Sequence, residues 1–129
     1  MRSEKVGGII LDNEYILLIK GRYSHKWNVP KGSREKGESI RTTGIRELRE
    51  ETGNTFEISK YDIPIKLKKV FLYVIRGSKH KLFLNPIDTN EIEDIRWFKV
   101  RDIDTRIPGS ETTGLLTSVV QYLLKNDMV

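Results

Sequence analysis

Apolar residues along this chain of 129 residues follow two different periods. Two β-branched apolar runs come first, at residues 6–11 and 15–20, and the polar stretch Asp12–Glu14 separates them. Such runs joined by a short polar turn predict a β-hairpin. Residues 70–75, VFLYVI, are apolar at every position, which is typical of a central strand covered on both faces.

Helical spacing occurs in two places. Residues 39–52 are mostly helix-compatible, with Ser39 as a possible N-cap and Gly53 where a helix C-terminus favours glycine. Near the end of the chain, apolar residues repeat every three or four positions, which predicts an amphipathic helix packed on the sheet. These residues are Leu115, Leu116, Val119, Val120, Leu123 and Leu124.

The remaining segments complete an α/β order. We expect a long loop at 21–38, alternation at 65–68, a partner strand at 80–86, an acidic loop at 88–94 and a short strand at 95–100. The order of strands, helix, strands and helix predicts an α/β fold with a mixed sheet. The length suits a single domain over residues 1–129.

Composition narrows the chemistry. The net charge of +5 favours an anionic partner, such as nucleic acid, nucleotide or a phosphorylated small molecule. The chain has no cysteine, which excludes disulfides, thiolate zinc sites and cysteine nucleophiles. Its apolar runs are too short to span a membrane, and Asp12 comes too early for a signal peptide. We therefore expect no membrane partner and a cytoplasmic location.

Three glutamates lie close together on the first predicted helix. Glu47, Glu50 and Glu51 occupy positions i, i+3 and i+4, which share one side of a helix. Carboxylates gathered in this way repel one another unless a cation lies among them. Oxygen ligands favour Mg²⁺ or Mn²⁺ rather than zinc. A solvated helix face with ion pairs, such as Arg46 with Glu50, is the alternative.

The residues around these glutamates form a longer pattern. Gly32 is followed after five residues by Glu38, and after seven more by RELREETG at residues 46–53. This resembles the Nudix box, G-x5-E-x7-R-E-U-x-E-E-x-G-U, where U is a bulky apolar residue. Such a match arises by chance with a probability on the order of 10⁻⁹ per window. The last apolar position is Asn54 instead, which puts the local packing in question.

The resemblance implies a fold and a reaction. The fold would be an α/β/α sandwich with a mixed sheet, the box as strand, loop and helix, and a C-terminal amphipathic helix. The reaction would be hydrolysis of a phosphoanhydride in a nucleoside diphosphate linked to another moiety, with Mg²⁺ or Mn²⁺ as cofactor. Glu47, Glu50 and Glu51 would be metal ligands together with the backbone carbonyl of Lys31, and one glutamate is a candidate to act on the attacking water.

The other box residues would support these ligands. Arg46 is expected to hold Glu47 by a charge-assisted hydrogen bond. Glu38 would brace the loop, and Gly32 and Gly53 would serve backbone geometry.

Nudix chains often supply a further carboxylate from a late loop, as base or metal ligand. Glu91, Glu93 and Asp94 are the candidates here. We favour Glu91 because the pattern NEI…I.WF resembles the mRNA-decapping branch. A solvated acidic loop is the alternative for all three.

Two features near the box bear on the substrate. Lys31 lies in WNVPKG, a form that resembles mRNA-decapping enzymes and dinucleoside tetraphosphate hydrolases, whereas the diphosphoinositol polyphosphate branch usually reads P-G-G-G. Lys31 could reach a phosphate, or it could be an ordinary surface lysine. Tyr23 and Trp27 could stack on a base, although a tryptophan beside a strand is commonly a core residue.

Residues 60–86 are strongly basic. Seven Lys or Arg accompany a single acid, Asp62. Such a stretch could bind the phosphates of RNA, or it could protect a sheet edge. The basic residues are Lys60, Lys66, Lys68, Lys69, Arg76, Lys79 and Lys81.

These features rank the candidate functions. Hydrolysis at the 5′ end of RNA comes first, with mRNA cap removal as the specific reaction, followed by dinucleoside polyphosphate hydrolysis. Diphosphoinositol polyphosphate and nucleotide house-cleaning hydrolysis rank lower, and a nucleotide- or RNA-binding module is the non-enzymatic alternative. Cellular decapping enzymes carry a helical domain before the Nudix domain, whereas this chain begins with the Nudix strands; a viral-type enzyme or a bare catalytic domain would account for that. The sequence does not indicate an oligomeric state.

Overall fold

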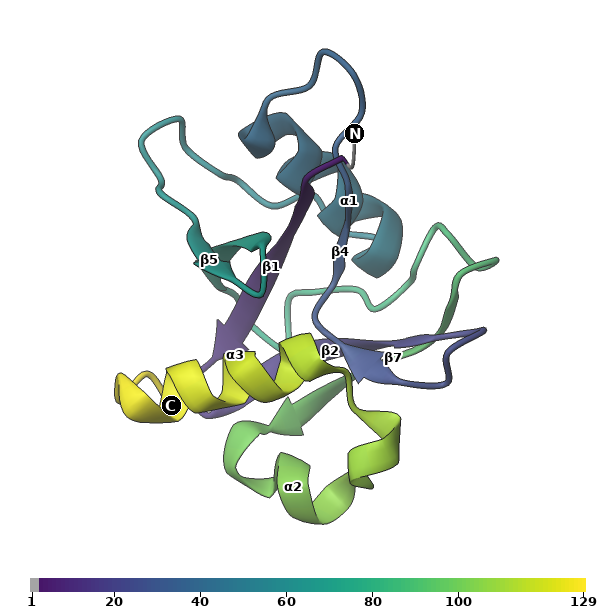
Figure 1. Ribbon diagram of the computed structural model, residues 1–129, viewed down its shortest axis with the longest axis vertical. Helices are drawn as coiled ribbons and strands as arrows, with labels where there is room; N and C mark the ends of the chain where they lie inside the picture. Colours follow the sequence, from purple (N-terminus) through teal and green to yellow (C-terminus); the bar gives the residue numbers. More distant parts are fainter. Residues whose placement is uncertain (1–2) are drawn as a thin grey trace.

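A seven-stranded mixed sheet organises the chain in a computed structural model that describes residues 3–129 (Figure 1). The elements are β1 (Lys5–Asp12), β2 (Tyr15–Gly21), β3 (Trp27–Asn28), β4 (Lys31–Ser33), α1 (Ile40–Thr52), β5 (Ile65–Leu67), β6 (Val70–Arg76), β7 (Ile92–Lys99), α2 (Ile103–Arg106) and α3 (Gly114–Lys125). Short 3₁₀ turns at Val100–Asp102 and Gly109–Glu111 flank α2.

Strand β1 lies at the centre of this sheet. It pairs antiparallel with β2 and β4 and parallel with β6, so the sheet is mixed, as the sequence predicts. The main path runs β3-β2-β1-β6-β5, with β4 added to β1 and β7 to β2. Pairing of β1 with β2 is confined to the hairpin end, beside Leu11 and Asp12. Beyond it the two strands diverge, and β2 crosses the molecule together with β7 (Figure 1).

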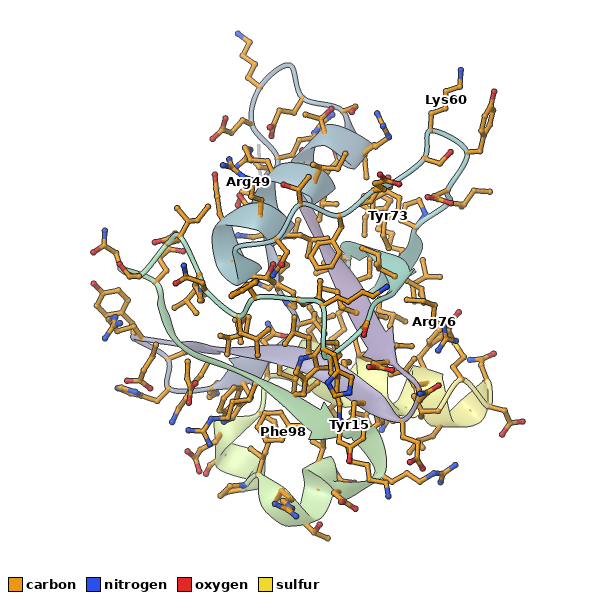
Figure 2. All side chains as sticks on the ribbon, turned by 180° about the vertical axis from the view of Figure 1, so that it is seen from behind. Tyr15, Arg49, Lys60, Tyr73, Arg76 and Phe98 are labelled. Carbon is orange, nitrogen blue, oxygen red and sulfur yellow. The ribbon has the colours of Figure 1, made fainter. Side chains whose placement is uncertain are left out.

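The two long helices cover opposite faces of the sheet. Along β1, Ile9 and Leu11 pack in the cluster that contains α3, whereas Val6 and Ile10 pack in the cluster that contains α1. Helix α3 lies in front of the sheet in Figure 1, and α1 comes to the front when the molecule is turned (Figure 2). The α/β/α sandwich predicted from the sequence is therefore confirmed.

Helix α1 begins and ends at the expected residues. The side chain of Ser39 accepts a hydrogen bond from the N–H of Thr42 at 3.0 Å, which satisfies one of the free donors of the first turn. Gly53 adopts the left-handed conformation, with φ of 83°, and ends the helix. A Cβ added to Gly44 would lie 3.3 Å from the ring of Tyr73 on β6, so glycine at this position lets the helix approach the sheet closely.

Two segments differ from the sequence prediction. The expected loop at 21–38 contains the short strands β3 and β4. The strand expected at 80–86 is absent from the described structure, because β1 and β5 already occupy both edges of β6. That segment belongs instead to the β6–β7 loop, residues 77–91, which packs Leu82 and Leu84 against the α1 side of the sheet.

The C-terminal helix forms where its apolar periodicity predicts. Leu116, Val119 and Leu123 are fully buried on α3, and the side chain of Thr113 caps its N-terminus. Within residues 3–129, no helix combines the length and the apolar character needed to cross a membrane.

Candidate active site

The acidic face of α1 opens into a polar cavity of about 440 Å³. Strand β4 and the start of β1 form one wall of this cavity, and the end of the β6–β7 loop forms another. The cavity is lined by Lys5, Lys31, Gly32, Ser33, Glu35, Arg46, Glu47, Glu50, Glu51, Asp88 and Glu91. The three box glutamates therefore share one space with carboxylates from a distant part of the chain.

Arg46 is the main cation among these carboxylates. Its guanidinium donates to Glu47 Oε1 at 2.7 Å and to Glu38 Oε2 at 2.7 Å. It also reaches Glu50 Oε1 at 3.3 Å and donates to the backbone carbonyl of Ser33 at 2.9 Å. Its hydrogen bonds hold the pKa of Glu38 at about 2, and Glu38 in turn raises the pKa of the guanidinium. Arg46 thus fixes the loop, Glu47 and the start of the acidic face at once.

Glu51 is the most enclosed of the three box glutamates. Its side chain is buried, and Oε1 accepts the backbone N–H of Lys31 at 2.9 Å. Burial raises the pKa of Glu51 to about 8, against the lowering effect of that hydrogen bond. Burial also raises the pKa of Glu47, with Arg46 opposing this shift and the charges of Glu50 and Glu91 adding to it.

Two glycines allow these close approaches. A Cβ on Gly32 would collide with the carboxyl group of Glu47, so only glycine lets that carboxylate lie against β4. A Cβ on Gly53 would collide with the backbone carbonyl of Asn85, so this residue combines a left-handed conformation with contact to the β6–β7 loop.

The three acids of the late loop, Glu91, Glu93 and Asp94, lie in different surroundings. Glu91 lines the cavity. Glu93 instead lies 3.6 Å from both Lys20 Nζ and His25 Nδ1, and Asp94 pairs with Arg96 at 2.8 Å. Only the favoured candidate faces the box glutamates.

Asp88 is a cavity residue that the sequence analysis did not single out. Its backbone N–H donates to the carbonyl of Glu50 at 3.0 Å, which brings the loop to the C-terminal end of α1. Its side chain accepts the N–H of Glu91 at 3.2 Å. The acidic run of residues 88–94 was the available signal, but the contact with α1 is a tertiary feature.

The three residues expected to bind substrate, Lys31, Tyr23 and Trp27, differ in location and exposure. Lys31 lines the cavity, and Tyr23 is 80% exposed on the loop between β2 and β3. Trp27 is only 7% exposed and packs edge-to-face on Phe98, with ring centroids 4.8 Å apart. A base-stacking role for Trp27 is therefore wrong in this structure, because its ring belongs to the core.

The donor set suits a hard divalent cation. As the side chains stand, residues 3–129 contain no group of three His, Cys, Asp or Glu converging on a single metal position. Glu47 is held by Arg46, and Glu51 by the N–H of Lys31. The carboxylates nevertheless line one cavity, and oxygen donors of this kind match Mg²⁺ or Mn²⁺.

Comparison with known proteins identifies the family of this chain. A family model described as the NUDIX domain matches residues 1–115, and this chain belongs to the Nudix family. It is 33% identical over 108 residues to an mRNA-decapping enzyme subunit 2 from Arabidopsis thaliana, covering 77% of this chain and 28% of that protein. It is 28% identical over 115 residues to an RNA pyrophosphohydrolase from Shewanella frigidimarina, covering 70% of this chain and 67% of that protein.

The fold is also found among solved structures. The crystal structure of a C. elegans Ap4A hydrolase superposes with a TM-score of 0.64, covering all of both chains at 17% sequence identity. That likeness concerns the fold. This chain spans only 13–28% of the length of the decapping proteins from Arabidopsis, C. elegans and Saccharomyces cerevisiae that it matches.

Proposed function

We propose that this chain is a divalent-metal-dependent pyrophosphohydrolase acting at the 5′ end of RNA, with cap removal as its specific reaction. The observation that carries the proposal is one cavity in which six carboxylates meet two lysines and Arg46. The carboxylates are Glu35, Glu47, Glu50, Glu51, Asp88 and Glu91, and the lysines are Lys5 and Lys31. We also propose that residues 1–129 form a single Nudix domain.

Each group has a role in this proposal. Glu47, Glu50, Glu51 and the backbone carbonyl of Lys31 would hold Mg²⁺ or Mn²⁺. The bound ion would supply positive charge next to the phosphates and lower the pKa of a coordinated water. Arg46 keeps Glu47 oriented, since its Nη1 lies 2.7 Å from Glu47 Oε1.

The bond changes are those of an anhydride hydrolysis. The oxygen of a water molecule forms a bond to phosphorus, and Glu91 accepts the proton of that water. The bridging P–O bond breaks, and its electron pair stays on the leaving phosphate. The products are a nucleoside diphosphate and an RNA with a 5′-monophosphate. Lys5 and Lys31 face the negative charge that develops on the phosphates.

The β5–β6 hairpin favours RNA over a free dinucleotide. Lys66, Lys68 and Lys69 on this hairpin are exposed. Val70, the next residue, pairs with Lys5 on β1, and Lys5 Nζ donates to Ser33 Oγ in the cavity wall at 2.8 Å. The hairpin therefore adjoins the cavity, where it can meet the phosphodiester chain that follows the 5′ end.

The rest of the basic stretch lies elsewhere. Arg76 pairs with Leu11, and the N–H of Lys79 donates to Asp12 Oδ2 at 2.8 Å, at the opposite end of β1. Strands β1 and β6 separate the two groups by roughly 20 Å, at about 3.3 Å per residue. Only the hairpin lysines are assigned to RNA contact in this proposal.

The substrate is tested with one panel, assayed with Mg²⁺ and with Mn²⁺. The panel contains capped RNA, 5′-triphosphate RNA, free cap dinucleotide, diadenosine tetraphosphate and a diphosphoinositol phosphate. We expect a nucleoside diphosphate to be released from capped RNA in preference to the free dinucleotide. A preference for diadenosine tetraphosphate would replace the proposed substrate with a dinucleoside polyphosphate.

Three variants separate hydrolysis from simple binding. Glu50→Gln and Glu91→Gln should each lower kcat by at least about 100-fold. Glu93→Gln changes an acid of the neighbouring strand whose partners are Lys20 and His25, and it should retain activity. An unmodified protein that binds capped RNA but cleaves nothing in the panel would support the binding-module alternative.

A further inference from the structure

We infer that Asn54 is a positioning residue: its side-chain amide fixes the β6–β7 loop so that Asp88 and Glu91 face the box glutamates. The inference rests on the proposed function. It starts from the one position where this chain departs from the box pattern, since a bulky apolar residue is expected where Asn54 stands.

The amide of Asn54 pairs with a single residue of the loop in both directions. Its Oδ1 accepts the backbone N–H of Phe83 at 3.2 Å, and its Nδ2 donates to the backbone carbonyl of Phe83 at 2.6 Å. The same Nδ2 donates to the carbonyl of Thr52 at 3.1 Å. The amide thus joins the last turn of α1 to the loop, as a neighbouring strand would do. An apolar side chain could make none of these bonds.

Phe83 is held by its backbone. Its ring is 82% exposed, so burial of this side chain cannot hold the loop here. Leu82 and Leu84 on either side are partly buried against the α1 side of the sheet. Their packing keeps the loop near the helix, but side-chain packing is less directional than a paired hydrogen bond. The amide of Asn54 therefore sets the register of the loop.

The loop then satisfies the free carbonyls at the end of α1. The N–H of Asn85 donates to the carbonyl of Thr52 at 3.1 Å. The N–H groups of Ile87 and Asp88 donate to the carbonyl of Glu50 at 2.9 and 3.0 Å. These carbonyls have no partner within the helix, so the loop completes its C-terminal end. Asp88 is thereby bonded to the backbone of a box glutamate.

The far end of this segment has a second anchor. The backbone N–H of Arg22 donates to the carbonyl of Glu91 at 2.8 Å. Its guanidinium donates to the carbonyls of Thr89 at 3.0 Å and Ile92 at 3.3 Å. Asp88 and Glu91 therefore lie on a short segment held at both ends, at Asn54 and at Arg22. Release of either end would let the two carboxylates move away from the cavity.

The test replaces the amide with an apolar group of similar size, Asn54→Leu. We expect kcat on capped RNA to fall about 10- to 100-fold, because small displacements of reacting groups carry costs of this size. KM should change less than about threefold, since the phosphate-facing lysines are untouched. Amide hydrogen exchange at Ile87 and Asp88 should become at least about tenfold faster, as expected for local opening.

A double-mutant cycle distinguishes positioning from general stability. In a Glu91→Gln background, Asn54→Leu should cost less than about twofold in kcat, because Glu91 is the one positioned carboxylate that takes the proton in the proposed reaction, and it is already lost. The matched control is Asn126→Leu. Asn126 donates from its own amide to a helix carbonyl, that of Tyr122 at 2.8 Å, at the end of α3 and outside the cavity lining. This control should lower thermal stability and leave kcat unchanged.

Asn54→Asp provides a second variant if Asn54→Leu does not fold. It retains the acceptor for the N–H of Phe83 and loses both donors, so kcat should again fall. Equal losses of kcat with and without Glu91, or unchanged exchange at Ile87 and Asp88, would overturn the inference while the hydrolase remained. An unmodified protein without turnover would instead defeat the proposed function.

Discussion

Arg46 donates two parallel hydrogen bonds to the carboxylate of Glu38, Nε to Oε2 at 2.7 Å and Nη2 to Oε1 at 2.9 Å. This paired geometry joins the loop before α1 to the middle of the helix. It is the strongest form of carboxylate recognition by arginine and restrains both side chains. Since Arg46 also contacts Glu47, the position of a proposed metal ligand depends on a residue that is not itself proposed as a ligand.

Glu38→Gln should weaken this arrangement in a pH-dependent way. The pKa of Glu38 is lowered to about 2, mainly by its hydrogen bonds from Arg46. The ionised carboxylate therefore stabilises the fold above pH 4.5, and this contribution is lost as the pH falls towards 2. Urea unfolding between pH 2 and 6 should show a shallower acid-induced loss in the variant. Parallel curves for both proteins would contradict this prediction.

In metal-free protein, Glu51 should make the folded state less stable as the pH rises, which is the opposite of the effect of Glu38. Its pKa is raised from 4.5 to about 8, so its proton is bound more tightly in the folded state. The associated stability is complete below pH 4.5 and is lost as the pH rises through 8, by at most about 1.4 kcal/mol per pH unit. Thermal unfolding in a chelator should show a decline between pH 6 and 8 that Glu51→Gln removes.

Binding of Mn²⁺ should itself depend on pH through Glu51. A metal ligand must be deprotonated, so Mn²⁺ binding should strengthen as the pH approaches 8 and should release a proton. Calorimetric titrations in two buffers of different ionisation enthalpy measure that proton. Proton release of the same size from Glu51→Gln would show that another group is responsible.

Gly32→Ala should impair catalysis more than folding. The added Cβ would collide with the carboxyl group of Glu47, and the backbone of Gly32 does not adopt a positive φ. We expect kcat to fall about 10- to 100-fold through displacement of Glu47, with a small change in the unfolding midpoint. Gly109→Ala is the control, because no atom lies within 4 Å of the Cβ it would add. Normal turnover by Gly32→Ala would show that the Glu47 position is not critical.

The turn of the β5–β6 hairpin should reveal a conflict between stability and binding. Lys68 and Lys69 have φ angles of 46° and 66°, a conformation that costs a non-glycine residue roughly 1 kcal/mol. The double change Lys68→Asn and Lys69→Gly suits this type of turn, so the unfolding midpoint should rise. Affinity for long RNA should fall, with a salt slope smaller by about 2.

The matched control removes two charges from the distant basic group. Arg76→Gln with Lys81→Gln changes the net charge by the same amount; Arg76 is the last residue of β6, and the backbone N–H of Lys81 donates to the carbonyl of Ser78 just beyond it. Affinity for RNA should change far less than in the hairpin variant. Equal losses in both variants would mean that RNA responds to overall charge, and the hairpin would have no special role.

Local sequence patterns predicted the elements that depend on local physics. The hairpin of β1 and β2, the caps of α1 at Ser39 and Gly53, and helix α3 all follow from periodicity and capping. Strands β3 and β4 were missed because two- and three-residue strands have no periodicity of their own. They exist through pairing with β2 and β1, which is a tertiary effect.

Two other expectations from the sequence differ from the structure. Residues 80–86 resemble a strand, but both edges of β6 are occupied, so Phe83 pairs with the amide of Asn54 instead of a strand. Trp27 precedes the box and suggested base stacking, yet β3 turns its ring onto Phe98. Spacing in the box predicted which glutamates share a helix face, but Asp88 joins them through a backbone contact between remote segments.

Strand β1 has a consequence for how a long substrate would be held. At its first residues it pairs with Ser33 on one side and with Val70 on the other. The cavity wall at β4 and the lysine-bearing turn before β6 are thus held on the two sides of β1, by two ladders that share this strand. If RNA is the substrate as proposed, the distance between the hydrolytic site and the lysines that would bind the chain is set by β1, and changing the length of the surface loops would leave it the same.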